Sequence, residues 1–284
     1  MHPNSTISMS DVPFSSFLSL YTILVVFMQL NPRLEMSTDF VPKTLIGSCM
    51  DRRLNHMIDS MFSENKAHGN VVVVRSAGST MRGLKETIDE IVGKGEIERI
   101  YFYTHTDCGA CQFVYEATRN HLDVSNRLGL ALVNYIAEPG KTFSSSADVE
   151  AENITLLRNA LEEYQRKGIE VRVEEVNMNT LNVPKEAWSE NMTLVVGKPF
   201  SGSFKMLASK LGLNPWTMFC INANRIADVI PDIDVAVLAL KIKKIKILST
   251  SHNEVFWAEE QLKILTLMDF MRTGDVIAEV VKLD

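Results

Sequence analysis

The sequence predicts an α/β protein in which a mostly parallel β-sheet is flanked by helices. From residue 43 onward, short apolar runs alternate with segments whose apolar residues have helical spacing. Residues 71–74 are all valine, and a fully apolar, β-branched run is typical of a strand buried on both faces of a parallel sheet. The order of these elements recurs after residue 190, which predicts a second copy of the same unit.

The first half contains the elements of one complete α/β unit. We expect strands at residues 44–46, 71–74, 97–103 and 169–176, and helices at residues 54–62, 80–92 and 149–167. Gly168 directly follows the last helix, as is common where a helix ends in a left-handed residue. A first domain can therefore end near Pro184.

The second half repeats this order with loosely similar residues. We align residues 193–195 with 44–46, 218–223 with 72–77, 242–250 with 97–105, and 276–283 with 169–176. Residues 258–270 correspond in position to the long helix of the first half. The alignment divides the chain into an N-terminal extension (1–35), a first domain (36–185) and a degenerate second repeat (186–284).

The N-terminal extension contains an apolar, uncharged run at residues 13–30. No Lys or Arg precedes it, so it lacks the positive region of a secretory signal, and it is at the short end for spanning a bilayer. We expect a disordered extension or a hydrophobic targeting segment. We expect a cytoplasmic protein, and the apolar run leaves secretion or membrane anchoring as alternatives.

Composition excludes several classes of function. The formal net charge of −6 and the pI of about 5.6 provide no basic surface for nucleic acid. The cysteines at positions 49, 108, 111 and 220 are too sparse and irregular for a disulfide framework. Reduced thiols or metal ligands are therefore expected.

Two short motifs follow directly after predicted strands: residues 49–53 (CMDRR) and residues 105–109 (HTDCG). The carboxyl ends of strands are where functional sites gather in open α/β sheets. Two thiolates and one imidazole, from Cys49, Cys108 and His105, form a ligand set that suits zinc. Three protein ligands leave a fourth position for water, as in catalytic zinc sites.

These motifs, together with Arg-Ser-Ala-Gly at residues 75–78, occur in an order and spacing that resembles the β-class carbonic anhydrases. The resemblance covers residues 43–110 well and continues to about residue 176 through the order of elements. It implies one zinc ion per chain and the reversible hydration of carbon dioxide to bicarbonate by a zinc-bound hydroxide. It also implies a dimeric core.

The resemblance assigns a role to two further residues of the first motif. Asp51 would accept a hydrogen bond from the zinc-bound hydroxide, and Arg53 would orient Asp51. If Arg53 released it, Asp51 could itself take the fourth zinc position and close the site.

The second repeat lacks this chemistry. Lys198 or Pro199 stands at the position of Cys49, Thr250 at that of His105, and Asn253 at that of Cys108. We expect no zinc there. Because the family's sites lie near a subunit interface, the second repeat could replace a partner subunit and form a pseudo-dimer, which could assemble further into homo-oligomers.

Three departures from the family pattern leave alternatives open. Ser76 stands where Asn is common, Thr104 where Gly is common, and Cys111 creates a Cys-x-x-Cys pair with Cys108. One alternative is a related zinc hydrolase acting on carbon disulfide or carbonyl sulfide. The others are a non-catalytic, zinc-stabilised binding or assembly protein, and a redox protein using Cys108 and Cys111.

Overall fold

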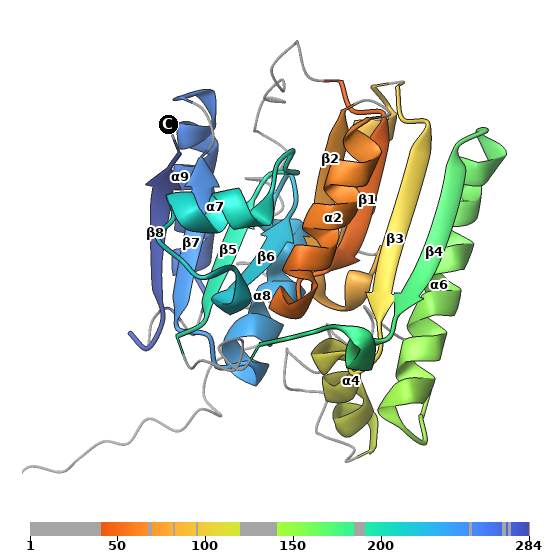
Figure 1. The fold of residues 1–284 in the computed structure, drawn as a ribbon. Helices are drawn as coiled ribbons and strands as arrows, with labels where there is room; N and C mark the ends of the chain where they lie inside the picture. The colour runs from red at the N-terminus through yellow and green to blue at the C-terminus, as the bar shows by residue number, and fades with distance from the viewer. Residues whose placement is uncertain are drawn as a thin grey trace, which may run out of the picture. The chain divides into compact units, whose positions relative to one another are not determined.

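The computed structural model describes residues 41–67, 70–81, 83–94, 96–119, 141–184, 191–249, 252–268, 271 and 274–283 (Figure 1). The expected N-terminal extension lies outside the described residues. Within the part of the chain that is described, no helix is long and apolar enough to cross a bilayer.

The first half forms a four-stranded sheet in which every neighbouring pair is parallel, with the order β2-β1-β3-β4. Its strands are β1 (Thr44–Cys49), β2 (Val71–Ser76), β3 (Arg99–His105) and β4 (Glu170–Val176). All residues of β1 and β2 are buried, as their apolar runs predict, whereas β4 is partly exposed along its length. The α/β class and the parallel sheet are confirmed.

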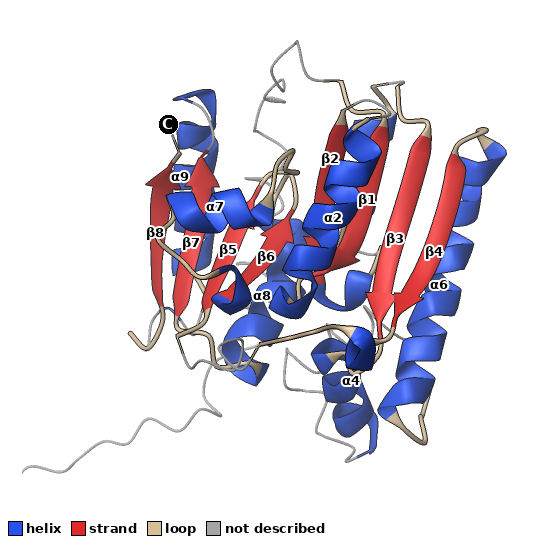
Figure 2. Ribbon diagram, in the orientation of Figure 1, coloured by secondary structure: helices blue, strands red, loops and turns tan. Residues whose placement is uncertain are grey.

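The helices of the first half are α2 (Asn55–Lys66), α3 (Lys85–Val92), α4 (Gly109–Arg119) and α6 (Ser146–Arg166). Helix α2 packs on β1 and β2, and α6 packs on β4 (Figure 2). Helix α6 begins three residues before the predicted start because the Ser145 hydroxyl caps it, accepting a hydrogen bond from Asp148 N at 3.2 Å.

The helix predicted at residues 80–92 begins only at Lys85. The residues before it form a short 3₁₀ turn, η3 (Ala77–Ser79), in which Gly78 has φ +68° and Ser79 has φ +59°. Thr80 is extended. Two successive left-handed residues followed by an extended one are incompatible with an α-helix, so the turn delays the helix.

The second half forms another parallel sheet with the equivalent order β6-β5-β7-β8. Its strands are β5 (Thr193–Gly197), β6 (Met218–Asn222), β7 (Lys244–Ser249) and β8 (Ile277–Lys282). The helices are α7 (Phe204–Lys210), α8 (Ile230–Asp234) and α9 (His252–Thr266). Helix α9, predicted at residues 258–270, begins earlier, soon after β7, and packs on β7 and β8.

The strand registers test the alignment of the two halves. Thr193 pairs with Met218 and Lys244, as Thr44 pairs with Val71 and Arg99. Met218 therefore occupies the position of Val71, so the predicted alignment of residue 218 with residue 72 is wrong by one residue. The alignments of β5 with β1, β7 with β3 and β8 with β4 agree with the registers. A common origin of the halves and the domain boundary at residues 185/186 stay predictions.

The two halves share one hydrophobic core, and β2 contacts β6 where they meet. Val73 and Phe200 exchange backbone hydrogen bonds of 2.8 and 3.1 Å across this junction. On α2, the Asn55 side chain donates to the carbonyl oxygens of Pro215 and Met218 at 2.7 and 2.8 Å. The second half therefore covers the β2 edge of the first sheet.

Candidate metal centre

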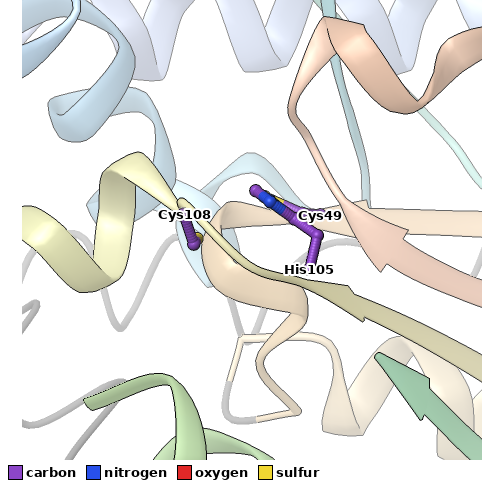
Figure 3. A group of neighbouring side chains, drawn as sticks. All are labelled: Cys49, His105 and Cys108. Atoms are coloured by element: carbon purple, nitrogen blue, oxygen red, sulfur yellow. The ribbon is translucent and has the colours of Figure 1, made fainter. Parts of the chain in front are cut away.

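The three predicted ligands come from two neighbouring strands and the start of a helix. Cys49 is the last residue of β1, His105 is the last residue of β3, and Cys108 immediately precedes α4. Parallel pairing of β1 with β3 brings the two strand ends together. The ligand atoms of the three side chains lie within 4.8 Å of one another, and all three side chains are buried (Figure 3).

The imidazole of His105 is oriented for a metal ion. Its Nδ1 lies 2.8 Å from the carbonyl oxygen of Thr106, and because a carbonyl only accepts, Nδ1 carries a proton. Its Nε2 is buried and has no hydrogen-bond partner among the described residues. Metal-bound histidines commonly donate their other ring N–H to a carbonyl in this way. The orphaned Nε2 therefore fits a metal ion.

Hydrogen bonds position the thiol of Cys49 and the backbone of Cys108. Gly78 N donates to Cys49 Sγ at 3.3 Å, and Cys108 N donates to Glu150 Oε1 at 2.9 Å. A hydrogen bond with Cys108 and burial raise the pKa of the Cys49 thiol. Burial lowers the pKa of His105, but its interactions with Cys49 and the charge of Asp51 raise it to about 9. Metal binding would therefore displace protons from the ligands.

Arg75, for which no individual role is predicted from the sequence, holds the backbone of the first motif. Its side chain is fully buried, and its Nε and Nη2 donate to Cys49 O at 2.8 and 2.6 Å. Nη2 also donates to Asp51 O at 2.8 Å, and Nη1 donates to Asn55 Oδ1. The guanidinium lies 4.9 Å from the centre of the Phe204 ring, which belongs to the second half.

Asp51 and Arg53 form a bidentate ion pair beside the ligands. Arg53 Nη2 donates to Asp51 Oδ2 at 2.7 Å, Nε donates to both carboxylate oxygens at 3.0 and 3.1 Å, and the backbone N donates to Oδ1 at 2.9 Å. Arg53 is itself held by Asp107, at 2.7 Å from Oδ2 and 2.8 Å from the carbonyl. The predicted pair therefore forms.

The charge state of Asp51 follows from these contacts. Burial alone would raise the pKa of the Asp51 carboxyl, but the hydrogen bonds of Arg53 and the charges of His105 and Arg53 bring it below its ordinary value. The carboxylate does not belong to the group of ligand atoms formed by Cys49, His105 and Cys108. In this geometry Asp51 is thus an ionised acceptor held by Arg53.

The remaining cysteines are buried outside the ligand group. Cys111 lies on the first turn of α4 and Cys220 on β6. Burial raises the pKa of Cys220 to about 12, so this thiol stays protonated and packs as a small hydrophobic residue.

The second half holds a lysine where the first half holds a ligand. By strand register Lys198 takes the position of Cys49, and its Nζ lies 4.0 Å from Glu254 Oε1 and 5.5 Å from the centre of the Trp257 ring. Thr250 and the side chain of Asn253 lie outside the described residues. No second group of possible metal ligands occurs among the residues that are described.

Comparison with known proteins gives matches only by structure. No protein-family model matches the chain, and no curated protein matches its sequence. The β-carbonic anhydrase CcaA is 16% identical, with a TM-score of 0.38, over 58% of this chain and 78% of its own. The carbonic anhydrase from Glaciozyma antarctica is 14% identical, with a TM-score of 0.35, over 61% of this chain and 96% of its own.

One of two tetrameric β-carbonic anhydrases from Sordaria macrospora is 14% identical, with a TM-score of 0.34, over 58% of this chain and 92% of its own. The matched structures are of the family that the sequence motifs resemble. At these identities and TM-scores the likeness does not decide the function, so we base the function on the residues of the site.

Proposed function

We propose that this chain is a zinc-dependent carbonic anhydrase that catalyses the reversible hydration of carbon dioxide to bicarbonate. One observation carries the proposal: the buried group of Cys49, His105 and Cys108 lies in the same motifs as the ion pair of Asp51 and Arg53. A purely structural zinc site has no need of that ion pair.

The ligand set supports one zinc ion per chain. Two sulfur atoms and one imidazole nitrogen are ligands that zinc prefers, and His105 Nε2 has no other described partner. Cys111 is outside the group, so the three ligands leave a fourth position available. Zinc bound there would act as a Lewis acid that lowers the pKa of a water molecule to about 7.

The chain's own residues would orient the reaction. The ionised Asp51 can accept a hydrogen bond from the attacking water or hydroxide, which directs an oxygen lone pair toward the carbon of carbon dioxide. Arg53, which is itself held by Asp107, would keep Asp51 in this accepting position and out of the metal's fourth ligand position. Loss of the Arg53 contact would let Asp51 compete for the fourth position.

The second half would take the place of a partner subunit in a pseudo-dimer. It covers the β2 edge, and Leu240 Cδ2 lies 3.8 Å from where a Cβ on Gly109 would stand, next to Cys108. The second half thus places an apolar side chain next to the residue that follows Cys108. Further assembly of pseudo-dimers into homo-oligomers is part of the same proposal.

The test measures zinc content and carbon dioxide hydration by stopped flow on the purified protein, with Cys49→Ala, Asp51→Ala and the control Cys220→Ala. The control makes the same substitution at a buried cysteine outside the ligand group. We expect about one zinc per chain in the wild type, with hydration lost in the first two variants and retained in the control.

The other outcomes separate the alternatives. Stoichiometric zinc without hydration would refute the proposed reaction, and assays with carbonyl sulfide and carbon disulfide would then distinguish a related hydrolase from a non-catalytic zinc protein. If the protein contains no zinc and two reactive thiols disappear on oxidation, the results would instead favour a redox protein that uses Cys108 and Cys111.

A further inference from the structure

The turn η3, between β2 and α3, supplies the hydrogen bond to the Cys49 sulfur. Gly78 N is the donor, at 3.3 Å from Sγ. Gly78 and Ser79 both have positive φ, and a non-glycine residue persists there only when its surroundings hold it. The direction of the Gly78 N–H therefore depends on what anchors the turn.

Three side chains anchor η3. Asn153 on α6 donates from Nδ2 to Gly78 O at 2.5 Å, and the Ser79 hydroxyl donates to Tyr103 O at 2.8 Å. The third anchor is Asp232, whose Oδ1 accepts a hydrogen bond from Ala77 N. The first two contacts lie within the half that contains the ligands, whereas Asp232 belongs to α8 of the second half.

Asp232 is firmly placed. Its side chain is 1% exposed, and the neighbouring Ile233, Val235 and Ala236 are fully buried in the shared core. A carboxylate that accepts from a buried N–H makes a stronger hydrogen bond than a neutral acceptor does. The contact fixes Ala77, the residue whose carbonyl shares a peptide plane with the Gly78 N–H.

We propose that Asp232 is a positioning residue for the metal ligand Cys49, acting from the second half through Ala77 and the Gly78 N–H. This inference rests on the metal site of the proposed function, though not on its substrate. The second half contributes no described ligand, yet through Asp232 it sets the metal affinity and the electron density of the Cys49 thiolate. Outer-shell hydrogen bonds of this kind orient and tune metal ligands.

The test is metal binding to the metal-free, reduced full-length chain. Co²⁺ and Zn²⁺ are titrated against a competing chelator into the wild type, Asp232→Ala and Asp232→Asn, and the thiolate-to-cobalt charge-transfer band is recorded. The control is Ile233→Val, a mild core change on the same helix. Thermal unfolding of each variant checks that it is folded.

We expect Asp232→Ala to weaken binding of both metals by roughly 10- to 100-fold, the range typical of a lost outer-shell partner. Its cobalt band should move to lower energy, because a thiolate that loses a hydrogen bond gives up its electrons more easily. Asp232→Asn keeps an oxygen acceptor for Ala77 N, so it should restore both readouts, and Ile233→Val should leave them unchanged.

Wild-type affinity and an unshifted band in Asp232→Ala would overturn the inference. So would an equal loss in Asp232→Asn, or an equal shift in Ile233→Val. If Asp232→Ala is not folded, Asp232→Ser takes its place, because the shorter side chain also removes the acceptor. None of these readouts involves carbon dioxide, so a wild type that binds metal without hydration would refute only the proposed reaction.

Discussion

Replacing Arg75 with methionine removes a buried cation on which the first motif depends. Among the described contacts, Asn55 Oδ1 loses its donor, whereas Cys49 O keeps Ser48 Oγ at 3.3 Å and Asp51 O keeps Leu54 N at 3.0 Å. An unsatisfied buried polar group costs about 1–3 kcal/mol and a lost hydrogen bond about 0.5–1.5 kcal/mol, so one such group and two such bonds set a range of about 2–6 kcal/mol. Because methionine also relieves the cost of burying a guanidinium, we expect the lower end, about 2–4 kcal/mol.

The assay is urea unfolding of the zinc-loaded and metal-free forms, with Arg172→Met as the matched control. Arg172 lies on β4 with a side chain that is 61% exposed, so the same substitution there should change the free energy of unfolding by less than about 0.5 kcal/mol. If Arg75→Met lowers the free energy of unfolding by less than about 1 kcal/mol, Arg75 does not stabilise the first motif through several hydrogen bonds, because a single hydrogen bond contributes that much.

Three further changes have defined outcomes. Arg53→Ala should retain stoichiometric zinc while hydration falls roughly 100-fold or more, since Asp51 loses its orientation; loss of zinc itself would contradict this separation of roles. Asp59→Ala removes the acceptor of Phe204 N at 2.6 Å and Lys205 N at 3.0 Å, which caps α7, and urea unfolding should show a loss of about 1–2 kcal/mol. In Gly47→Ala the new Cβ would overlap the Phe102 ring, so unfolding should show a loss of about 1–3 kcal/mol, relieved by adding Phe102→Leu. If the free energy of unfolding is unchanged in Asp59→Ala or in Gly47→Ala, the contact at that residue does not have the expected effect on stability.

The sequence predicts the elements that depend on local pattern. Runs of apolar, β-branched residues indicate β1 and β2 because both strands are buried on every residue. Cys49 and His105 are predicted to meet because each ends a parallel strand of the same sheet. Strand pairing is the only contact between distant parts of the chain that these two predictions need.

What the sequence does not predict depends on backbone conformation and on distant partners. The delayed start of α3 follows from the left-handed Gly78 and Ser79, which a helical pattern of apolar residues conceals. Arg75 and Asp232 are charged residues whose burial depends on acceptors and donors far along the chain. A signal did exist in Arg75, because an arginine that directly follows four strand valines needs a partner when it is buried.

Zinc K-edge X-ray absorption of the purified protein tests whether Cys49, His105 and Cys108 bind one zinc ion. We expect about one zinc per chain with two Zn–S distances of about 2.3 Å, one Zn–N distance of about 2.0–2.1 Å and one further light atom. A shell of three or four sulfur atoms would place Cys111 in a closed structural site and contradict the proposed site of three protein ligands. Spectra lacking sulfur would remove Cys49 and Cys108 as ligands.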